Sequence, residues 1–390
     1  MGSLASRRIV VDFNGHAGSP PVQPLIDELR RLKVGELITL RHPLSESHGH
    51  AHEMNVYRDG LLAESRSWQS PLPPPASFLL DGLYPVRLPR VDVWVGMNPL
   101  SAYRGLLRKR LGWTKRVVYW AIDYSPRRFT FPPAESVYRF LERRSCLQTD
   151  LRIELSPQAA QAREAALNVE AGANAAPHLV LPIGVNHHDV VRGRSSDSRP
   201  LNLVFAGSLD ERNGAHLLIP MLQLIRRKFP SGHLTVIGRG PLDKEICESI
   251  TRLELQDHVK LVGFLESHAD VTASLRQAQI GLAPYTNLGK DSFTQFADPS
   301  KIKDYLAAGL PVVTTSETPI AHLLEARGAG TICEPEPQAL ADAVIALLND
   351  EPRWRTHSRQ AADLAEEFSW ETLLQPFMDF IIQPEDWRIE

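Results

Sequence analysis

Short apolar runs alternate with amphipathic segments along the chain. In the first half, residues 22–32 carry apolar positions at helical spacing, after a strand-like run and a turn of small residues. Strands that alternate with helical segments predict βαβ units and a parallel sheet. The region 41–90 is less regular, and the prolines at 71–75 indicate a loop. The predicted strands of this half lie at 8–13, 91–98, 116–124 and 151–157.

The second half shows the same alternation more regularly. It predicts a doubly wound domain in which the turns at the carboxyl ends of the strands face one crevice. A polar, turn-rich segment at 186–200 is typical of an interdomain connection. We therefore predict an α/β fold with one domain at 1–185, a linker at 186–200 and a second domain at 201–370. The predicted strands of the second half lie at 201–207, 233–240, 259–265, 280–285, 312–315 and 330–335.

Composition and charge narrow the class of protein. A chain of 390 residues is long enough for two α/β domains. Its net charge of −3 gives no global attraction to nucleic acid. Cys146, Cys247 and Cys333 are widely spaced and suit a reducing compartment better than a disulfide framework or a zinc site. No apolar run approaches the length of a signal peptide or a membrane span, so we expect a cytoplasmic protein.

Three alternate histidines, His48, His50 and His52, would share one face of a strand and suggest a metal site. Their surroundings, SESHGHAHE, are loop-like and supply no fixed geometry. We predict no metal site in this chain.

The segment FADPSKIKDYLAAGLPVVTT, residues 296–315, predicts a loop, a helix, a tight turn and a buried strand. Asp298 is expected as the helix N-cap and Pro299 as the first helical residue. Lys301 then lies in the first turn, beside unpaired backbone N–H groups and the positive end of the helix dipole. Gly309 ends the helix. This arrangement predicts an anion site, most naturally for a phosphate.

Five motifs of the second half keep their order and spacing: FAGSLDERNG (205–214), VIGRGP (236–241), VKLVGF (259–264), GLAPY (281–285) and DPSKIKDYLAAGLPVV (298–313). In this series the second half resembles the donor domain of family-4-type glycosyltransferases (glycosyl transferases group 1) of GT-B architecture. The resemblance implies two facing Rossmann-like domains with a cleft between them. It also implies that a C-terminal helix at 371–390 returns to the N-terminal domain.

The resemblance implies a function as well. The second domain would bind a nucleotide-diphosphate sugar, UDP- or GDP-linked, and the first an acceptor hydroxyl on a glycan, a lipid-linked glycan or a small molecule. Such enzymes generally retain anomeric configuration and need no metal or cofactor. The donor phosphate is commonly proposed to help take the acceptor proton. The expected role is the synthesis of a bacterial surface polysaccharide or glycoconjugate.

The chain departs from the common family pattern at four positions. Many members carry two glutamates separated by seven residues, where this chain has Phe296 and Asp304. The usual arginine and lysine of the glycine turn fall on Ser208 and Asn213. A subgroup with proline, lysine and an acidic–aromatic pair before the Ala-Ala-Gly turn is closer to this chain. In it, the lysine at the Lys301 position is the expected phosphate partner.

The chemistry of the reaction assigns roles to these residues. A diphosphate leaving group needs cations or helix amides, which Lys301 and Arg212 or Arg239 can supply. Asp304, one turn beyond Lys301, is the candidate ribose acceptor, with a helical pair to Lys301 or Lys303 as the alternative. Glycines let the backbone approach the donor closely. The predicted donor contacts are Gly15, His16, Gly207, Ser208, Arg212, Gly238, Arg239, Phe264, Tyr285, Ser300, Lys301 and Asp304, with Gly263 as a further close approach.

The first domain offers two further candidates. The turn that holds Gly15 and His16 follows the first strand, where it can face the donor phosphates, although a short glycine loop is also common as an ordinary turn. Asp123 ends a strand, and with Lys301 and Asp304 it completes the predicted catalytic set as acceptor-orienting group or base. A structural pairing with Arg127 or Arg128 is the alternative.

Basic residues are concentrated in RGLLRKRLGWTKR, residues 104–116, where they interleave with leucines and Trp113. This pattern suits peripheral contact with an anionic membrane surface at the inner face. An amphipathic helix packed on its own sheet is the alternative.

Two other functions fit the same architecture. A nucleotide-sugar epimerase would need acid/base groups around the sugar, and no such set is evident. A nucleotide-sugar-binding subunit without catalysis would explain the missing glutamate and the missing arginine and lysine. The leading hypothesis is a hexosyltransferase that uses a nucleotide sugar.

Overall fold

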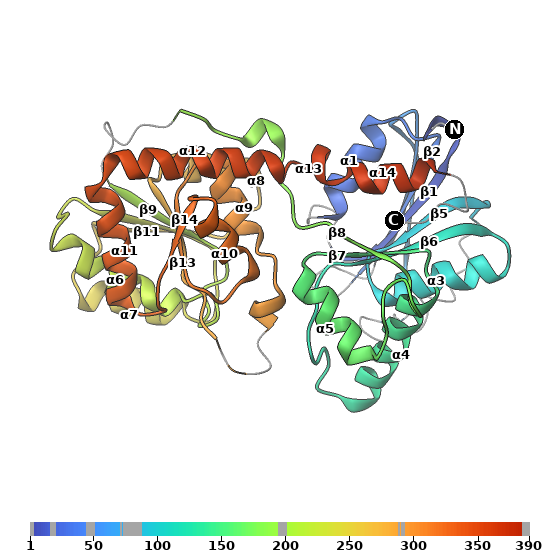
Figure 1. Ribbon diagram of the computed structural model, residues 1–390, viewed down its shortest axis with the longest axis horizontal. Helices are drawn as coiled ribbons and strands as arrows, with labels where there is room; N and C mark the ends of the chain where they lie inside the picture. Colours follow the sequence, from blue (N-terminus) through green and yellow to red (C-terminus); the bar gives the residue numbers. More distant parts are fainter. Residues whose placement is uncertain are drawn as a thin grey trace. The chain divides into compact units, whose positions relative to one another are not determined.

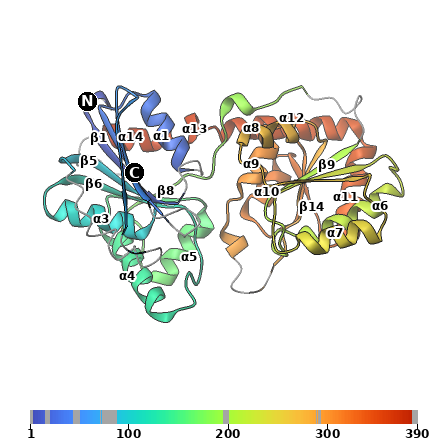
Figure 2. The same cartoon turned by 180° about the vertical axis from the view of Figure 1, so that it is seen from behind.

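The computed structural model describes residues 4–15, 21–43, 51–70, 72, 88–193, 201–287, 289 and 293–383. The chain forms two compact units, Met1–Pro182 with Leu373–Glu390, and Ile183–Thr372 (Figures 1 and 2). Each unit carries its own sheet with helices, so the predicted α/β class is confirmed.

The first unit is built on an eight-stranded sheet in the order β4-β3-β2-β1-β5-β6-β7-β8. The strands from β2 to β8 in this order are parallel, and their buried faces are rich in valine, isoleucine and leucine. The strands are β1 (Arg8–Asn14), β2 (Glu36–His42), β3 (Ala51–Arg58), β4 (Leu61–Gln69), β5 (Val91–Gly96), β6 (Thr114–Ala121), β7 (Leu151–Glu154) and β8 (His178–Val180).

The region that the sequence marked as less regular contains an antiparallel hairpin, β3–β4, so that expectation is wrong for residues 51–69. Asp59 and Gly60 connect the two strands, and both have positive φ, 51° and 78°. An Asp-Gly pair is the preferred two-residue hairpin turn because its twist matches that of the strands. The sequence therefore contained a local signal for this hairpin.

Helices and a C-terminal segment cover the first sheet (Figure 1). The C-terminal helix α14 packs on it: Arg116 donates to the carbonyls of Phe380 and Ile381 at 2.6 and 2.8 Å. The rings of Trp120 and Phe377 lie edge to face with centroids 5.6 Å apart. The helices are α1 (Val22–Arg31), α3 (Pro99–Arg110), α4 (Pro132–Gln148), α5 (Pro157–Leu167) and α14 (Gln375–Ile382).

The second unit has a six-stranded parallel sheet in the order β11-β10-β9-β12-β13-β14. Numbered within the unit this order is 3-2-1-4-5-6, which is the Rossmann order, with its reversal between β9 and β12. Ligands of such sheets bind outside the carboxyl ends of the strands at that reversal. The strands are β9 (Asn202–Ala206), β10 (His233–Ile237), β11 (Val259–Gly263), β12 (Ile280–Ala283), β13 (Val312–Thr314) and β14 (Gly330–Ile332).

Alternate residues of β9 supply two separate cores. Leu203 and Phe205 pack against α6, α7 and α11, whereas Val204 and Ala206 pack against α8, α9, α10 and α12. The period of two along the strand thus places helices on both faces of the sheet. These helices are α6 (Leu218–Arg226), α7 (Asp243–Arg252), α8 (His268–Leu275), α9 (Ser300–Ala307), α10 (Pro319–Ala326), α11 (Pro337–Asn349) and α12 (Glu351–Glu367), followed by α13 (Trp370–Leu373).

Helix α9 is fixed to the sheet at its reversal point. The buried Tyr305 hydroxyl accepts from the Ala206 amide at 2.8 Å and donates to the Leu282 carbonyl at 3.1 Å. Gly281 makes this packing possible, because a Cβ there would lie 2.5 Å from the Tyr305 ring. One hydroxyl thus ties the helix to both β9 and β12.

The predicted cap of α9 is wrong. The helix begins at Ser300, its N-cap is Pro299, and no side chain caps it. The Asp298 carboxylate accepts instead from the Ile183 amide and from Lys303 Nζ, each at 2.5 Å. Lys303 Nζ also lies 4.3 Å from the centre of the Phe368 ring. Asp298 therefore holds Ile183, the first residue of the unit, and Lys303 on α9, and it does not cap the helix.

Replacing Asp298 by Ala should destabilise the second unit by about 3–5 kcal/mol, because it leaves the Lys303 charge buried and unpaired. The two side chains are only 7% and 1% exposed. Lys244→Ala, at an ion pair whose side chains are 89% and 64% exposed, is the matched control and should cost less than about 1 kcal/mol. Denaturant unfolding of both variants measures the difference, and equal losses would show that the buried pair is not the stabilising contact.

Candidate functional site

Three glycines at the carboxyl ends of β9, β10 and β11 bring these strand ends into close contact. Gly207, Gly238 and Gly263 have φ values of +143°, +134° and +80°. The Gly207 amide donates to the Ile237 carbonyl at 2.9 Å, and the Gly238 amide donates to the Gly263 carbonyl at 2.8 Å. A Cβ on Gly238 would lie 1.9 Å from the Gly207 carbonyl oxygen. Their positive φ values favour glycine at all three turns, and the turns lie at the strand ends where Rossmann sheets bind ligands.

The Lys301 side chain reaches this place from the first turn of α9. Its Nζ donates to Asn213 Oδ1 at 2.7 Å. The amine also lies over the rings of Phe205 and Tyr285, 4.4 and 4.9 Å from their centres. A Cβ on Gly207 would be 2.7 Å from Nζ, so the missing side chain of that glycine makes room for the lysine.

Lys301 is buried, and no carboxylate in the described part of the chain lies within 4.0 Å of its amine. Burial lowers its pKa from 10.5 to about 7, and the more distant negative charge of Asp210 opposes this shift. The ring faces and one amide oxygen only partly compensate the lost hydration. A buried amine in this state is suited to receive an anion.

Tyr285 adds a second polar group to the same surroundings. It follows β12 and is buried, and its hydroxyl has no hydrogen-bond partner among the described residues. Burial raises its pKa well above the usual value, so the hydroxyl keeps its proton. A buried hydroxyl without a partner costs free energy, and a bound ligand with acceptor oxygens would satisfy it.

The turn after β9 is organised by Asp210. Its carboxylate accepts from the Asn213 amide and from Asn213 Nδ2, both at 2.8 Å. Burial raises the pKa of Asp210, but these hydrogen bonds, one from Ser208 and the charge of Arg212 lower it overall. Ser208 is exposed and Arg212 is half-buried on this turn. Asp210 thereby orients Asn213 toward Lys301.

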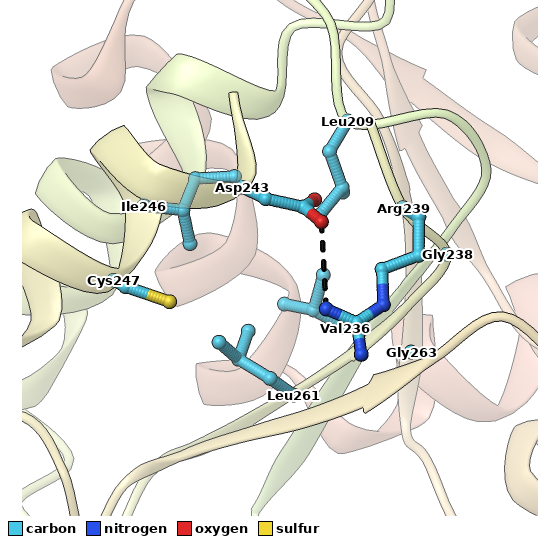
Figure 3. A pocket seen from close by; sticks show the side chains of 9 residues that line it. All are labelled: Leu209, Val236, Gly238, Arg239, Asp243, Ile246, Cys247, Leu261 and Gly263. Atoms are coloured by element: carbon cyan, nitrogen blue, oxygen red, sulfur yellow. Dashed lines mark hydrogen bonds and ion pairs between the residues drawn. The ribbon is translucent and has the colours of Figure 1, made fainter. Parts of the chain in front are cut away.

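Arg239 lies at the edge of the site. Its guanidinium is beside Gly263 and 3.4 Å from the Asp243 carboxylate, and the side chain is 70% exposed. Figure 3 shows both side chains at a small pocket. The neighbouring Phe264 is 73% exposed. The pocket is lined by Leu209, Val236, Gly238, Arg239, Asp243, Ile246, Cys247, Leu261 and Gly263.

Asp304 lies one turn beyond Lys301 on α9 and contacts His268, the first residue of α8. His268 Nε2 and Asp304 Oδ1 are 3.1 Å apart. The hydrogen bond and charge of Asp304 raise the pKa of His268, while partial burial opposes this. The alternative of a helical pair with Lys301 or Lys303 is wrong, because those amines contact Asn213 and Asp298. Ser300, the first residue of α9, is exposed.

The candidates of the first unit are placed separately. Asp123 pairs with Arg128, and its carbonyl accepts from Arg163 at 2.7 Å, so the predicted structural pairing is present. A role of Asp123 as base stays a prediction. Gly15 has a φ of +106° and its amide donates to the His42 carbonyl at 2.9 Å. His16 lies outside the described residues.

The basic segment 104–116 spans the end of α3, a turn and the start of β6. Its charges contact the unit itself: Arg104 pairs with Asp12 at 2.9 Å, Lys109 pairs with Asp150, and Lys115 pairs with Asp92 at 3.0 Å. Leu111 and Trp113 are 60% and 46% exposed. Helix α3 packs on β5 and β6, as the alternative to a membrane role predicts, and membrane contact stays a prediction.

In the described part of the chain, no helix has the length and apolar character needed to cross a membrane. No group of three or more His, Cys, Asp or Glu side chains is placed there to hold a metal ion. His48 and His50 lie outside the described residues, and His52 is buried with its Nδ1 at 2.7 Å from that of His42.

The structure thus gathers Gly207, Gly238, Lys301 and Tyr285 at one point, with Asp304 on the next turn of α9. Sequence reasoning left Phe205 and His268 out of the site and treated Asn213 only as a lost lysine. Asn213 could have been found from the sequence, because it departs from the family pattern. Phe205 could not be told from any other apolar strand residue. Nothing in the sequence pointed to His268, because its partner Asp304 lies on another helix.

Residues 200–350 match the family model described as Glycosyl transferases group 1. The resemblance recognised in the sequence motifs is therefore confirmed. Among sequence relatives, the amylovoran biosynthesis glycosyltransferase AmsK of Erwinia amylovora is 28% identical over 159 residues, which are 40% of this chain and 38% of that protein. The chain matches only between 36% and 40% of the length of the first curated relatives.

Solved structures extend the likeness to both units. The sucrose-phosphate synthase of Thermosynechococcus elongatus has a TM-score of 0.68 at 15% identity, over 96% of this chain and 98% of that chain. Anabaena HepE in complex with UDP has a TM-score of 0.65 at 17% identity, over 96% and 99%; HepE has also been solved with UDP-glucose. The predicted GT-B type of fold, with two Rossmann-like units, is confirmed.

Replacing Gly238 by Ala should destabilise the second unit by about 2–6 kcal/mol, since the change combines a glycine-only backbone with an overlap on Gly207. Gly328→Ala is the matched control. Gly328 also has positive φ, +65°, but the nearest atom to its Cβ would be 4.0 Å away, so we expect a loss of only about 1–2 kcal/mol. Thermal or denaturant unfolding measures both, and equal losses would contradict the close contact of the strand ends.

Proposed function

We propose that this chain is a retaining, metal-independent glycosyltransferase that uses a nucleotide-diphosphate sugar. It transfers the sugar to a hydroxyl of a glycan, a lipid-linked glycan or a small molecule, in the synthesis of a bacterial surface polysaccharide or glycoconjugate. The observation that carries the proposal is the buried amine of Lys301, without an anionic partner among the described residues, at the glycine-rich strand ends of a Rossmann sheet.

The amine suits a diphosphate for electrostatic reasons. Charge develops on the leaving diphosphate as the bond to the sugar breaks, and a fixed cation in a dry site stabilises it strongly. Lys301 and the first amides of α9 supply positive charge at the same place. Arg212 and Arg239 lie on the flanking turns and can approach the outer phosphate oxygens.

The transfer step follows the resemblance to retaining enzymes. The glycosidic bond to the donor phosphate breaks, and the acceptor oxygen attacks from the same face. In this proposal the departing phosphate takes the acceptor proton, while Lys301 holds the charge that remains. Asp123 is the candidate to orient the acceptor, although its pairing with Arg128 also gives it a structural role.

The spatial relation of Lys301 to Asn213 removes one argument for an inactive binding subunit, namely the missing positive charge at the turn. The turn lacks the usual lysine at Asn213, but the Lys301 amine lies 2.7 Å from the side chain at that position. The Lys301 amine of α9 therefore lies where the sequence had indicated a missing positive charge. The relative named for amylovoran synthesis and the neighbour solved with UDP-glucose make UDP-hexoses the first donors to test, with GDP-sugars next.

Incubation with a panel of nucleotide sugars and acceptors should release nucleotide diphosphate only when both substrates are present. Lys301→Met should reduce diphosphate binding at least tenfold, as measured by calorimetry with UDP, GDP, ADP and dTDP. Lys244→Met, at an exposed lysine of the same unit, is the control and should bind normally. Binding without turnover would favour the inactive subunit, and donor conversion without acceptor would favour the epimerase.

Diphosphate binding should weaken as pH rises above about 7. Lys301 has a pKa of about 7 in the free protein, and a bound diphosphate would raise it, so binding above pH 7 takes up a proton. The affinity should fall up to tenfold per pH unit until the pKa of the bound state is reached. The second ionisation of phosphate is complete by then, with a pKa of about 6.

Calorimetry at pH 8 in two buffers of different ionisation enthalpy measures the proton uptake directly. The Lys301→Met variant should show no proton uptake from the side chain at position 301. An affinity that is constant between pH 7 and 9, with no proton uptake by the wild type, would contradict the role of Lys301.

A further inference from the structure

We propose that the ribose of the donor nucleotide is recognised by the pair of Asp304 and His268, in which His268 is a positioning residue. His268 holds one oxygen of the Asp304 carboxylate and directs the other toward a ribose hydroxyl. This inference rests on the proposed function, because it concerns the same donor site. It goes beyond a lone carboxylate by adding a residue from another helix.

The position of Asp304 is fixed by its neighbours on α9. The next residue, Tyr305, is tied to β9 and β12 through its hydroxyl. Lys301, one turn earlier, lies at the glycine-rich strand ends. Residues three apart on a helix lie on the same side, so Asp304 and Lys301 border the same region. A nucleotide with its diphosphate at Lys301 would therefore bring its ribose toward Asp304.

The contact with His268 occupies only one carboxylate oxygen. His268 Nε2 is 3.1 Å from Oδ1, and Oδ2 has no hydrogen-bond donor among the described residues. The Asp304 side chain is 23% exposed and that of His268 is 56% exposed, so both remain accessible to a ligand. Oδ2 is therefore available to accept a hydrogen bond from a hydroxyl, and the contact of Oδ1 with the imidazole sets the orientation of the carboxylate.

The shorter side chain explains why a positioning residue is useful. Asp304 stands where many members of the resembled family carry glutamate, which is one methylene longer. A short carboxylate must be held in a suitable orientation to meet a hydroxyl, because hydrogen bonds weaken steeply when misaligned. The packing of α8 against α9 supplies His268 for this purpose.

The positive charge of His268 also reduces the electrostatic repulsion between Asp304 and a bound diphosphate. An unpaired Asp304 carboxylate would repel the diphosphate of the same nucleotide. The hydrogen bond and charge of Asp304 and the charge of Asp189 raise the pKa of His268, while partial burial lowers it. Arg276, on the same side, donates to the Asp189 carbonyl at 3.5 Å. The histidine thus offsets the negative charge of the residue that reads the ribose.

The test compares UDP with 2′-deoxy-UDP and 3′-deoxy-UDP by calorimetry. The wild type should bind at least one deoxy analogue about tenfold more weakly than UDP, which corresponds to one lost hydrogen bond. His268→Ala should weaken UDP binding and reduce this ratio to near one. Asp304→Asn should have the same effect on the ratio. His268→Gln, which keeps a donor, should retain most of the discrimination.

His322→Ala, at an exposed histidine of α10 in the same unit, is the matched control and should leave all three affinities unchanged. An unchanged ratio of UDP to deoxy-UDP affinity in His268→Ala would overturn the positioning role of His268, and an unchanged ratio in Asp304→Asn would overturn ribose recognition by the pair. Either result alone would leave the proposed function intact, provided that UDP binding still depends on Lys301. Absence of UDP binding in the wild type would instead contradict the proposed function.

Discussion

The burial of the Lys301 amine is the constraint on which the candidate site depends. A lysine removed from water loses its hydration, and the aromatic rings and single amide oxygen around Nζ replace only part of it. Its pKa near neutrality reflects this loss. The protein therefore holds a group that gains most when an anion arrives, at the point where the order of a parallel sheet reverses.

The rest of the unit holds this amine in place. Gly207 leaves room for Nζ, and Gly238 lets its own turn approach the Gly207 carbonyl. Helix α9 cannot shift easily, because Tyr305 ties it to two strands and Lys303 ties it to Asp298. A rigid helix thus carries both Lys301 and Asp304, and rigid support is what keeps catalytic and binding groups in productive geometry.

The site also shows how a departure from a family pattern is resolved in space. At the usual position for a turn lysine, Asn213 accepts a hydrogen bond from a lysine 88 residues further along the chain. Where a glutamate is usual, Asp304 contacts a histidine 36 residues earlier. Both contacts join different helices and loops at the same edge of the sheet. In each case, a residue from elsewhere in the fold supplies chemistry that the motif alone lacks.

The sequence by itself determined the α/β class, the strands and helices of the second half and the importance of Lys301, because apolar periodicity and glycine turns are local signals. It also contained the Asp59-Gly60 hairpin signal, which went unused because the pattern of residues 41–90 is less regular. Only the tertiary structure showed that Asp298 pairs with Lys303 instead of capping α9, that Lys301 meets Asn213, and that Asp304 meets His268. These partners depend on how helices pack on the sheet, which side-chain periodicity does not specify.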